Sequence, residues 1–463
     1  MPRVWDVPVL DPTRVRDARV AAEGAAALAG LDERRTAAAA LVATELATNL
    51  LKHAEGGQVL IEVVAPPAPR GEQSRVVQIA AIDHGPGIAD VHAAVRDGFS
   101  TTRSLGAGLG TCLRLADDFG LHTTPGRGTV AVARVGTTPR GDGAPAGPRV
   151  RVWADGMSGS WDHVPGPGGP AGAGHDGSGS GQWPGGAPPF GAVPCGGPTR
   201  HTRPAGRAGD VGVASGGVPA GSAVPSAAGA RLAPAPVLPG IGTAEPGPLT
   251  DTSQDRSLPL TTVRAGGVNI PYGGAEYSGD AWAWVRSGSL VTLMLADGLG
   301  HGPEAARASS TAVTTMHRWA GLSPAESLGR LHDALKGTRG AAVSLAQLDL
   351  AAGRLRFAGI GNVGARLHTG GTWRALLSRP GIVGVHRPAT FREVEADWTE
   401  DALLILHTDG LPSRWTPPSG PGQPLADPAV TAAVTIRDAS SPARPVRDDT
   451  AVAVLTSTPP ERP

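Results

Sequence analysis

Cysteine is almost absent from this chain, which holds two cysteines among 463 residues. Cys112 and Cys195 lie far apart in unlike sequence contexts, so we expect no disulfide framework. Long apolar runs are absent as well. No stretch approaches the ~18 apolar residues of a membrane-spanning helix, and the N-terminal segment MPRVWDVPVLDPTRVRDARV lacks the apolar centre of a signal peptide. The sequence therefore predicts a soluble, cytosolic protein without a membrane anchor.

An excess of charge of one sign is also missing. The chain contains 41 Lys and Arg residues and 41 Asp and Glu residues, which gives a formal net charge of +0. Proteins that bind nucleic acids or anionic membranes through long-range attraction usually carry a basic excess. The balanced charge argues against a nucleic acid or a membrane surface as the partner.

Glycine and proline are abundant, by contrast, with 67 and 44 residues. They concentrate in residues 136–258, which have the character of GPGGPAGAGHDGSGSGQWPGGAPPFGAVPCGGP. This stretch lacks the apolar periodicity of a helix or a strand, so it cannot bury enough surface to offset its chain entropy. We predict a disordered linker over 136–258 between folded domains at 1–135 and 259–457, with a disordered tail at 458–463.

Both folded segments mix helices with strands, which predicts the α+β class. In the first segment we expect helices from Asp11-Pro12 to about Ala29, from Leu31-Asp32 to about Ala54 and over 111–119, with strands at 59–64, 76–82 and 129–135. In the second segment we expect helices near 303–319 and 323–336, and strands at 290–296, 342–348, 355–360, 402–407 and 450–455.

The segment GFSTTRSLGAGLG, residues 98–110, raises the first question of function. Its last three glycines allow backbone N–H groups to approach an anion closely, and a predicted helix follows them. Glycine-rich turns are more often only turns, so the surroundings must decide. Glu45 and Asn49 share one face of the second helix, where a solvated polar face is the ordinary interpretation. Asp83 ends an apolar strand at a Gly-Pro-Gly turn, where a carboxylate can face a ligand.

These groups occur in a fixed order: ELATN (45–49), DHGPGI (83–88), GAGLG (106–110) and GRGT (126–129). The set resembles the GHKL, or Bergerat, ATP-binding α/β sandwich of DNA gyrase, heat-shock chaperone ATPases, histidine kinases and anti-sigma-factor serine kinases. The wording GFST…LGAGLG followed by RLADDF is most similar to the RsbT-type switch kinases of stress signalling. A histidine kinase needs a phosphoacceptor histidine before this domain, and a gyrase-like protein needs a folded transducer after it; neither is found.

The resemblance implies a role for each matching position. Asn49 would hold Mg²⁺ against the ATP triphosphate, and Glu45 would act as the base toward the incoming hydroxyl. Asp83 would accept from the adenine amino group, with Thr129 beside it. The implied nucleotide-binding glycines are Gly85, Gly87, Gly106, Gly108 and Gly110. Positioning and charge neutralisation of this kind are what phosphoryl transfer requires.

A second set of polar residues consists of aspartates next to apolar strands: Asp280, Asp297, Asp409 and the pair Asp448-Asp449. A single Asp-Gly is usually a turn. Four such sites, with glycines that permit close backbone approach, predict a binding site for a hard divalent cation. We assign no ligand role to His301, because carboxylate-rich Mg²⁺ or Mn²⁺ sites rarely need an imidazole.

The second segment resembles the PPM-type metal-dependent serine/threonine phosphatases in their bacterial SpoIIE/RsbX branch. The motifs that carry this resemblance are SGD (278–280), ADGLGHG (296–302), GIGN (359–362) and TDG (408–410). The resemblance implies an α-β-β-α sandwich with two Mn²⁺ or Mg²⁺ ions and an in-line attack by a metal-bridging hydroxide. Asp297 would bridge the metals and act in catalysis, and Asp280 would bind partly through waters. The other implied ligands are the Gly298 carbonyl, Asp409 and Asp448. The closing motif RDDT departs from the eukaryotic Asp-Asn pair, and we rank Asp448 above Asp449.

Both resemblances together imply a bifunctional signalling switch, in which a protein-serine kinase is tethered to a phosphoserine/phosphothreonine protein phosphatase. The implied substrates are STAS-domain antagonist or scaffold proteins that regulate an alternative sigma factor, with a sigma-factor regulator as a further partner. A linker of this length predicts little fixed geometry between the domains. One alternative is a phosphatase whose N-terminal module binds ATP or a sigma-factor regulator without catalysis. A non-enzymatic scaffold is disfavoured by the intact acidic set.

Overall fold

The computed structural model describes residues 3–54, 56–65, 75–91, 94, 108–136, 149–154, 262–386, 388, 390–418, 427–441 and 445–458. All of them belong to one compact unit, Met1–Gly169 together with Ser257–Pro463. Most of the segment 98–110, including Gly106, lies outside the described residues, and so does most of the predicted linker. Among the helices described, none is long and apolar enough to cross a membrane.

The N-terminal domain is built on a six-stranded sheet with the strand order β1-β2-β3-β5-β4-β6. Neighbouring strands are antiparallel except for β4 and β6, which run parallel. The strands are β1 (Val4–Val9), β2 (Gly57–Val64), β3 (Val76–Ile82), β4 (Asp118–Thr124), β5 (Gly128–Gly136) and β6 (Arg149–Ala154). Because β3 and β5 are neighbours, their ends bring Asp83 and Thr129 together.

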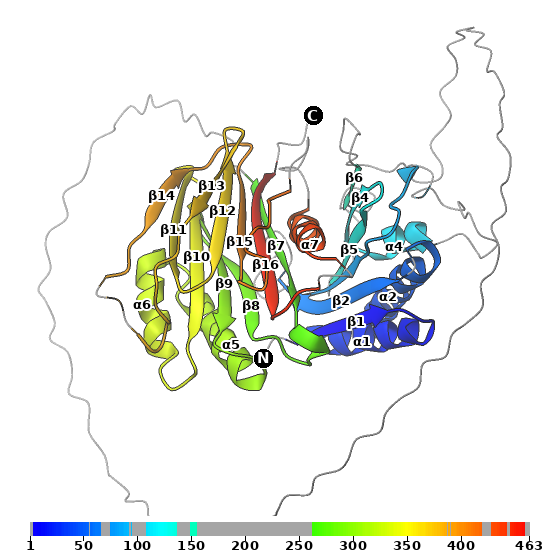
Figure 1. Cartoon of the computed structure of the whole chain (residues 1–463), viewed down its shortest axis with the longest axis horizontal. Coiled ribbons are helices and arrows are strands. Elements are labelled where there is room, and N and C mark those ends of the chain that lie inside the picture. Colours follow the sequence, from blue (N-terminus) through cyan, green and yellow to red (C-terminus); the bar gives the residue numbers. More distant parts are fainter. Residues whose placement is uncertain are drawn as a thin grey trace, which may run out of the picture. The chain divides into compact units, whose positions relative to one another are not determined.

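Helices α1 (Thr13–Ala29) and α2 (Glu33–His53) cover one face of this sheet (Figure 1). The side chain of Asp32 caps α2 by accepting from the backbone N–H of Arg35, as the sequence predicts. Helix α1 ends at Gly30, whose φ of 72° gives the left-handed cap that glycine adopts easily. Helix α4 (Gly108–Leu115) is short and packs in the same core.

Three details of the N-terminal domain differ from the prediction. The helix predicted over 111–119 spans Gly108–Leu115, and strand β4 begins at Asp118. All seven residues of β4 are buried, so its sequence lacks the polar-apolar alternation that marks a strand. Strand β1 was also not predicted. Strand β6 lies within 136–258, so the prediction of a structureless segment is wrong for these six residues.

The C-terminal domain contains two five-stranded antiparallel sheets. The first has the order β14-β11-β10-β9-β8, from β14 (Val394–Asp397), β11 (Arg354–Ile360), β10 (Ala341–Asp349), β9 (Leu290–Gly298) and β8 (Asp280–Ser287). The second has the order β13-β12-β15-β16-β7, from β13 (Thr372–Leu376), β12 (Gly364–Thr369), β15 (Leu403–His407), β16 (Thr450–Thr458) and β7 (Thr262–Ile270). Side chains of both sheets meet in one apolar core.

Helices complete the outer layers of this sandwich. Helices α5 (Pro303–Arg318) and α6 (Pro324–Ala334) pack on the outer face of the first sheet (Figure 1). Helix α7 (Pro428–Ala439) packs on the second sheet, against β7 and β16. This arrangement confirms the prediction of two α+β domains, the second with α-β-β-α layers. Helix α7 was not predicted, because a helix buried on all sides has no polar stripe. Asp427-Pro428 is the signal in the sequence for the start of this helix.

Helix α7 also packs against the N-terminal sheet. Its apolar residues share a core with side chains of β2, β3 and β5, namely Leu60, Ala80, Ile82, Val130 and Val132. Helix α7 packs closely against strand β4 at Gly120, where an added Cβ would lie only 2.6 Å from Val430 Cγ2. From the length of the linker we expected little fixed geometry between the domains. The shared core instead holds α7 against the N-terminal sheet.

A buried group of charges fixes the first turn of α7. Arg134 of β5 donates to both carboxylate oxygens of Asp427, at 2.8 and 2.7 Å. Arg264 of β7 donates to the same carboxylate at 3.0 Å. Asp427 in turn caps α7 by accepting from the backbone N–H groups of Ala429 and Val430. Because all three charged side chains are buried, each depends on the others for its compensation.

Replacing Arg134 with methionine is expected to lower the free energy of unfolding by about 3 kcal/mol, because Asp427 then loses its bidentate partner in a buried site. Urea unfolding followed by tryptophan fluorescence measures the loss. Arg354→Met is the control, since Arg354 pairs with Glu395 and Asp397 on the exposed surface and its removal should change little. Equal small losses in the two variants would contradict this role of Arg134.

Candidate functional site

Glu45 and Asn49 lie on the face of α2 that meets the start of α4. A Cβ at Gly108 would lie 3.1 Å from Asn49 Oδ1 and 3.5 Å from Glu45 Oε2. Both side chains are half-buried, which differs from a fully solvated polar face. The structure therefore places the first turn of α4, with its N–H groups and Gly110, directly beside the two polar side chains singled out in the sequence.

Asp83 is held at the end of β3 by backbone amides. Its Oδ1 accepts from the N–H of Gly85 at 2.8 Å and from the N–H of Thr129 at 3.0 Å. The Thr129 hydroxyl lies 3.1 Å from that of Thr123 on β4. Burial raises the pKa of Asp83, and the two amides act in the opposite direction. The carboxylate thus has one oxygen fixed by the protein and a second that can meet a ligand.

The glycines around Asp83 are required by close backbone packing. A Cβ at Gly128, where φ is 101°, would lie 2.1 Å from the Asp83 carbonyl oxygen. At Gly87, where φ is 76°, it would lie 2.7 Å from the Thr124 carbonyl oxygen, and at Gly85 it would lie 2.8 Å from Ala54 Cα. These contacts explain the glycines of the DHGPGI and GRGT motifs, because no larger residue fits at these positions.

The predicted acidic residues converge at one end of the C-terminal sandwich. Asp280 begins β8 and Asp297 lies near the end of β9, and the two are directly opposite each other in the antiparallel register. Directly opposite side chains have Cβ atoms about 4.5–5.5 Å apart, and like charges at this spacing repel. Asp409 follows β15, while Asp448 and Asp449 precede the neighbouring strand β16.

The electrostatics of this group indicate that a positive charge belongs there. Burial, together with the neighbouring Asp297, raises the pKa of Asp280 well above its ordinary value. Burial raises the pKa of Asp297 to about 7, and the carboxylates of Asp409 and Asp448 add to the effect. Asp280 is 1% exposed, and its Oδ2 has no hydrogen-bond partner. A buried carboxylate oxygen without a donor, surrounded by further carboxylates, fits a hard divalent cation.

The carboxylates are nevertheless not arranged as a finished coordination sphere. Across the described residues, no group of three or more His, Cys, Asp or Glu side chains is placed to hold a metal ion. Two of the aspartates have other partners: Asn362 donates to Asp409, and the backbone N–H groups of Tyr272 and Gly279 donate to Asp449, each at 2.8 Å. The residue types fit a hard divalent cation.

Three neighbouring positions qualify the predicted ligand set. Asp448 is exposed and accepts from the N–H of Asp449, whereas Asp449 is buried and turned toward the backbone. The ranking of Asp448 above Asp449 stays a prediction. Asn362 contacts the site but was not assigned a role, although the word GIGN contains it. At Gly298 a Cβ would lie 2.2 Å from the Ala305 carbonyl oxygen, so glycine is required there. His301 is exposed.

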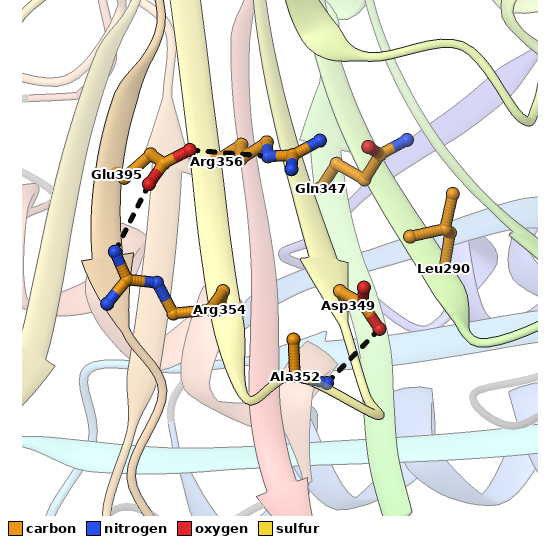
Figure 2. Close-up of a pocket in the computed structure, with 7 residues that line it drawn as sticks. All are labelled: Leu290, Gln347, Asp349, Ala352, Arg354, Arg356 and Glu395. Atoms are coloured by element: carbon orange, nitrogen blue, oxygen red, sulfur yellow. Dashed lines mark hydrogen bonds and ion pairs between the residues drawn. The ribbon is translucent and has the colours of Figure 1, made fainter.

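A pocket of about 230 Å³ lies elsewhere, at the opposite end of the same sheet (Figure 2). Leu290, at the start of β9, lines this pocket, whereas Asp297 is near the end of that strand. Figure 2 shows Glu395 between Arg354 and Arg356, at 3.1 and 3.5 Å. Since these arginines are already paired with a carboxylate, the pocket is no ready anion site and takes no part in the acidic centre.

Comparison with known proteins matches the two halves of the chain separately. Residues 9–134 match the family model of the histidine kinase-like ATPase domain, and residues 287–456 match that of stage II sporulation protein E (SpoIIE). The serine/threonine-protein kinase RsbT of Bacillus subtilis (strain 168) is 44% identical over 86 residues, which cover 19% of this chain and 61% of RsbT. The match therefore spans less than two thirds of the length of RsbT.

The phosphoserine phosphatase RsbX of the same organism is 25% identical over 140 residues, which cover 30% of this chain and 69% of RsbX. A crystal structure of RsbX in complex with magnesium is 21% identical, covers 42% of this chain and 96% of that chain, and gives a TM-score of 0.36.

The family models thus give each half a class to which it is similar: residues 9–134 to the histidine kinase-like ATPase domain, and residues 287–456 to stage II sporulation protein E. More particularly, the N-terminal domain is similar to the kinase RsbT and the C-terminal domain is similar to the phosphatase RsbX.

Proposed function

We propose that this protein is a bifunctional signalling switch, which phosphorylates serine residues of a protein substrate with ATP and removes phosphate from phosphoserine or phosphothreonine with a metal-dependent phosphatase. The observation that carries the proposal is the unpartnered, buried oxygen of Asp280 directly opposite Asp297. Two buried carboxylates this close together repel each other, and a bound divalent cation would compensate their charge.

In the phosphatase domain, two Mn²⁺ or Mg²⁺ ions, when bound, would supply positive charge for the phosphate and activate the attacking water. Asp297 would touch both ions, and the Gly298 carbonyl, Asp409 and Asp448 would complete their protein ligands. Asp280 would act partly through water. Asn362 would orient Asp297 and Asp409, because its amide contacts both carboxylates.

In the kinase-like domain, Asn49 would hold the Mg²⁺ that accompanies the ATP triphosphate, and Glu45 would accept the proton of the substrate hydroxyl. The free oxygen of Asp83 would accept from the adenine amino group, next to Thr129. Backbone amides of Gly106, Gly108 and Gly110 would bind the phosphates. Gly85 and Gly87 would line the nucleotide site beside Asp83. The N-terminus of α4 would add the positive end of its dipole.

The substrates we propose are STAS-domain antagonist or scaffold proteins that regulate an alternative sigma factor, with a sigma-factor regulator as a further partner. The support is the similarity of one half to RsbT and of the other half to RsbX. The balanced charge of the chain supports a protein partner rather than a nucleic acid or a membrane.

A second candidate function is a phosphatase with an ATP-sensing N-terminal module that transfers no phosphate. The contacts of α7 with the strands beside Asp83 favour it, because they join the two domains at the candidate adenine end.

Incubation of the full chain with labelled ATP, Mg²⁺ and a panel of STAS-domain proteins separates the two candidates. Label on a substrate serine supports the switch. Stoichiometric ATP binding without transfer to any substrate supports the sensor. Failure to bind ATP would contradict both.

A further inference from the structure

The last turn of α7 carries an arginine that is buried among residues of the other domain. Arg437 is 1% exposed. Its Nη1 donates to the backbone carbonyl of Gly128 at 3.1 Å, and its Nη2 donates to the Thr124 hydroxyl at 3.2 Å. Both acceptors belong to the N-terminal domain, at the end of β4 and the start of β5, where the turn between these strands is anchored. A side chain of the phosphatase domain thus enters the turn that borders the candidate nucleotide site.

The two acceptors of Arg437 are adjacent to the residues that hold Asp83. Gly128 packs on the Asp83 backbone, and the next residue, Thr129, donates its N–H to Asp83 Oδ1 at 3.0 Å. The imidazole Nε2 of His84 lies 3.1 Å from the carbonyl oxygen of Arg437. The end of α7 therefore contacts both the residue that follows Asp83 and the residue that precedes Thr129.

We propose that Arg437, a residue of the phosphatase domain, is a positioning residue for nucleotide binding in the kinase-like domain. It fixes the turn over 124–128 so that Asp83 presents its free oxygen to the adenine base. A guanidinium suits this task, because it is always charged and offers several donors in one rigid plane. This inference rests on the proposed nucleotide function. Its consequence is linkage: ATP binding and the docking of α7 stabilise each other.

The charge of Arg437 gives the role a pH signature. Burial raises the pKa of Asp83, and the charges of Arg437 and His84 act in the opposite direction. The other charged groups at this contact are Asp438, which accepts from Arg437 Nε at 2.9 Å, and Arg127, 3.4 Å from Asp438. Loss of the guanidinium raises the pKa of Asp83 further. Because the ionised carboxylate is the form that accepts from adenine, ATP binding then weakens at a higher pH during acidification.

The test is calorimetric titration of the full chain with ATP and with GTP at a series of pH values from about pH 5 to pH 8. Arg437→Met is expected to weaken ATP binding about tenfold, to reduce the preference for ATP over GTP, and to move the acid loss of binding to higher pH. Arg437→Lys keeps the charge but not the planar fork, so it should restore the pH profile without the full affinity. Arg16→Met, on the exposed side of α1, is the control and should match the wild type.

Wild-type affinity, base preference and pH profile in a folded Arg437→Met variant would overturn the inference alone. If thermal unfolding shows that Arg437→Met does not fold, Arg437→Lys decides, and wild-type affinity in that variant is the contradicting result. A wild-type chain that binds no ATP would overturn the proposed nucleotide function itself, together with this inference.

Discussion

Replacing Asp297 with asparagine is expected to reduce the metal-dependent phosphatase activity of the full chain at least about a hundredfold. The carboxylate lies opposite Asp280 on the neighbouring strand and among further acidic residues, and we propose that it touches both cations. The amide removes one negative charge and is a weaker ligand for a hard cation. Hydrolysis of a phosphoserine STAS-domain protein over a series of Mn²⁺ concentrations separates the loss of rate from the loss of metal affinity.

His301→Ala is the matched control for this prediction. His301 lies four residues beyond Asp297 but is exposed, and we assign it no ligand role. Its removal should leave both the rate and the Mn²⁺ dependence unchanged. Full activity in Asp297→Asn, or activity that survives thorough chelation of the metal, would exclude the two-metal mechanism.

Replacing Asn49 with alanine is expected to abolish phosphoryl transfer while the phosphatase remains active. The amide of Asn49 lies beside the first turn of α4, where the triphosphate and its Mg²⁺ would be bound. Without this ligand the charge of the phosphates is not neutralised, and transfer depends on that neutralisation. Transfer of label from ATP to a STAS-domain protein measures one activity, and release of phosphate from a phosphoserine substrate measures the other.

Thr48→Ala is the control on the same helix, because the Thr48 hydroxyl donates to the Thr44 carbonyl within α2. It should transfer phosphate at nearly the wild-type rate. Asp83→Asn should retain Mg²⁺ but lose the preference for ATP over GTP. Undiminished ATP binding in both Asn49→Ala and Asp83→Asn would contradict the assignment of these residues.

Features set by neighbours in the sequence were predictable. Helix α2 begins at a capping aspartate, and the apolar positions along it mark its buried face. Asp297, Asp409 and Asp448 could be found because each stands beside a predicted apolar strand, and antiparallel pairing brings Asp280 and Asp297 together. An acidic residue at the end of an apolar strand and next to glycines can therefore be predicted as a site residue from a single sequence.

Features set by distant neighbours were not predictable. Arg134 and Asp427 are 293 positions apart, and nothing near either residue indicates the other. Strand β4 and helix α7 are buried on all sides, which removes the polar-apolar pattern that distinguishes strands from helices. The orientation of Asp449 toward the backbone of Tyr272 and Gly279 likewise depends on tertiary contacts, so Asp448 and Asp449 could not be distinguished by pattern.

The central claim is that one chain both adds phosphate to a serine and removes it. The most direct test loads a STAS-domain protein with label from ATP and Mg²⁺, removes the remaining ATP with hexokinase and glucose, and then adds Mn²⁺. Label should appear on the serine in the first stage and leave it as inorganic phosphate in the second, with a metal chelator preventing the release. Label that never appears on the substrate, or that leaves equally fast in the presence of the chelator, would contradict the claim.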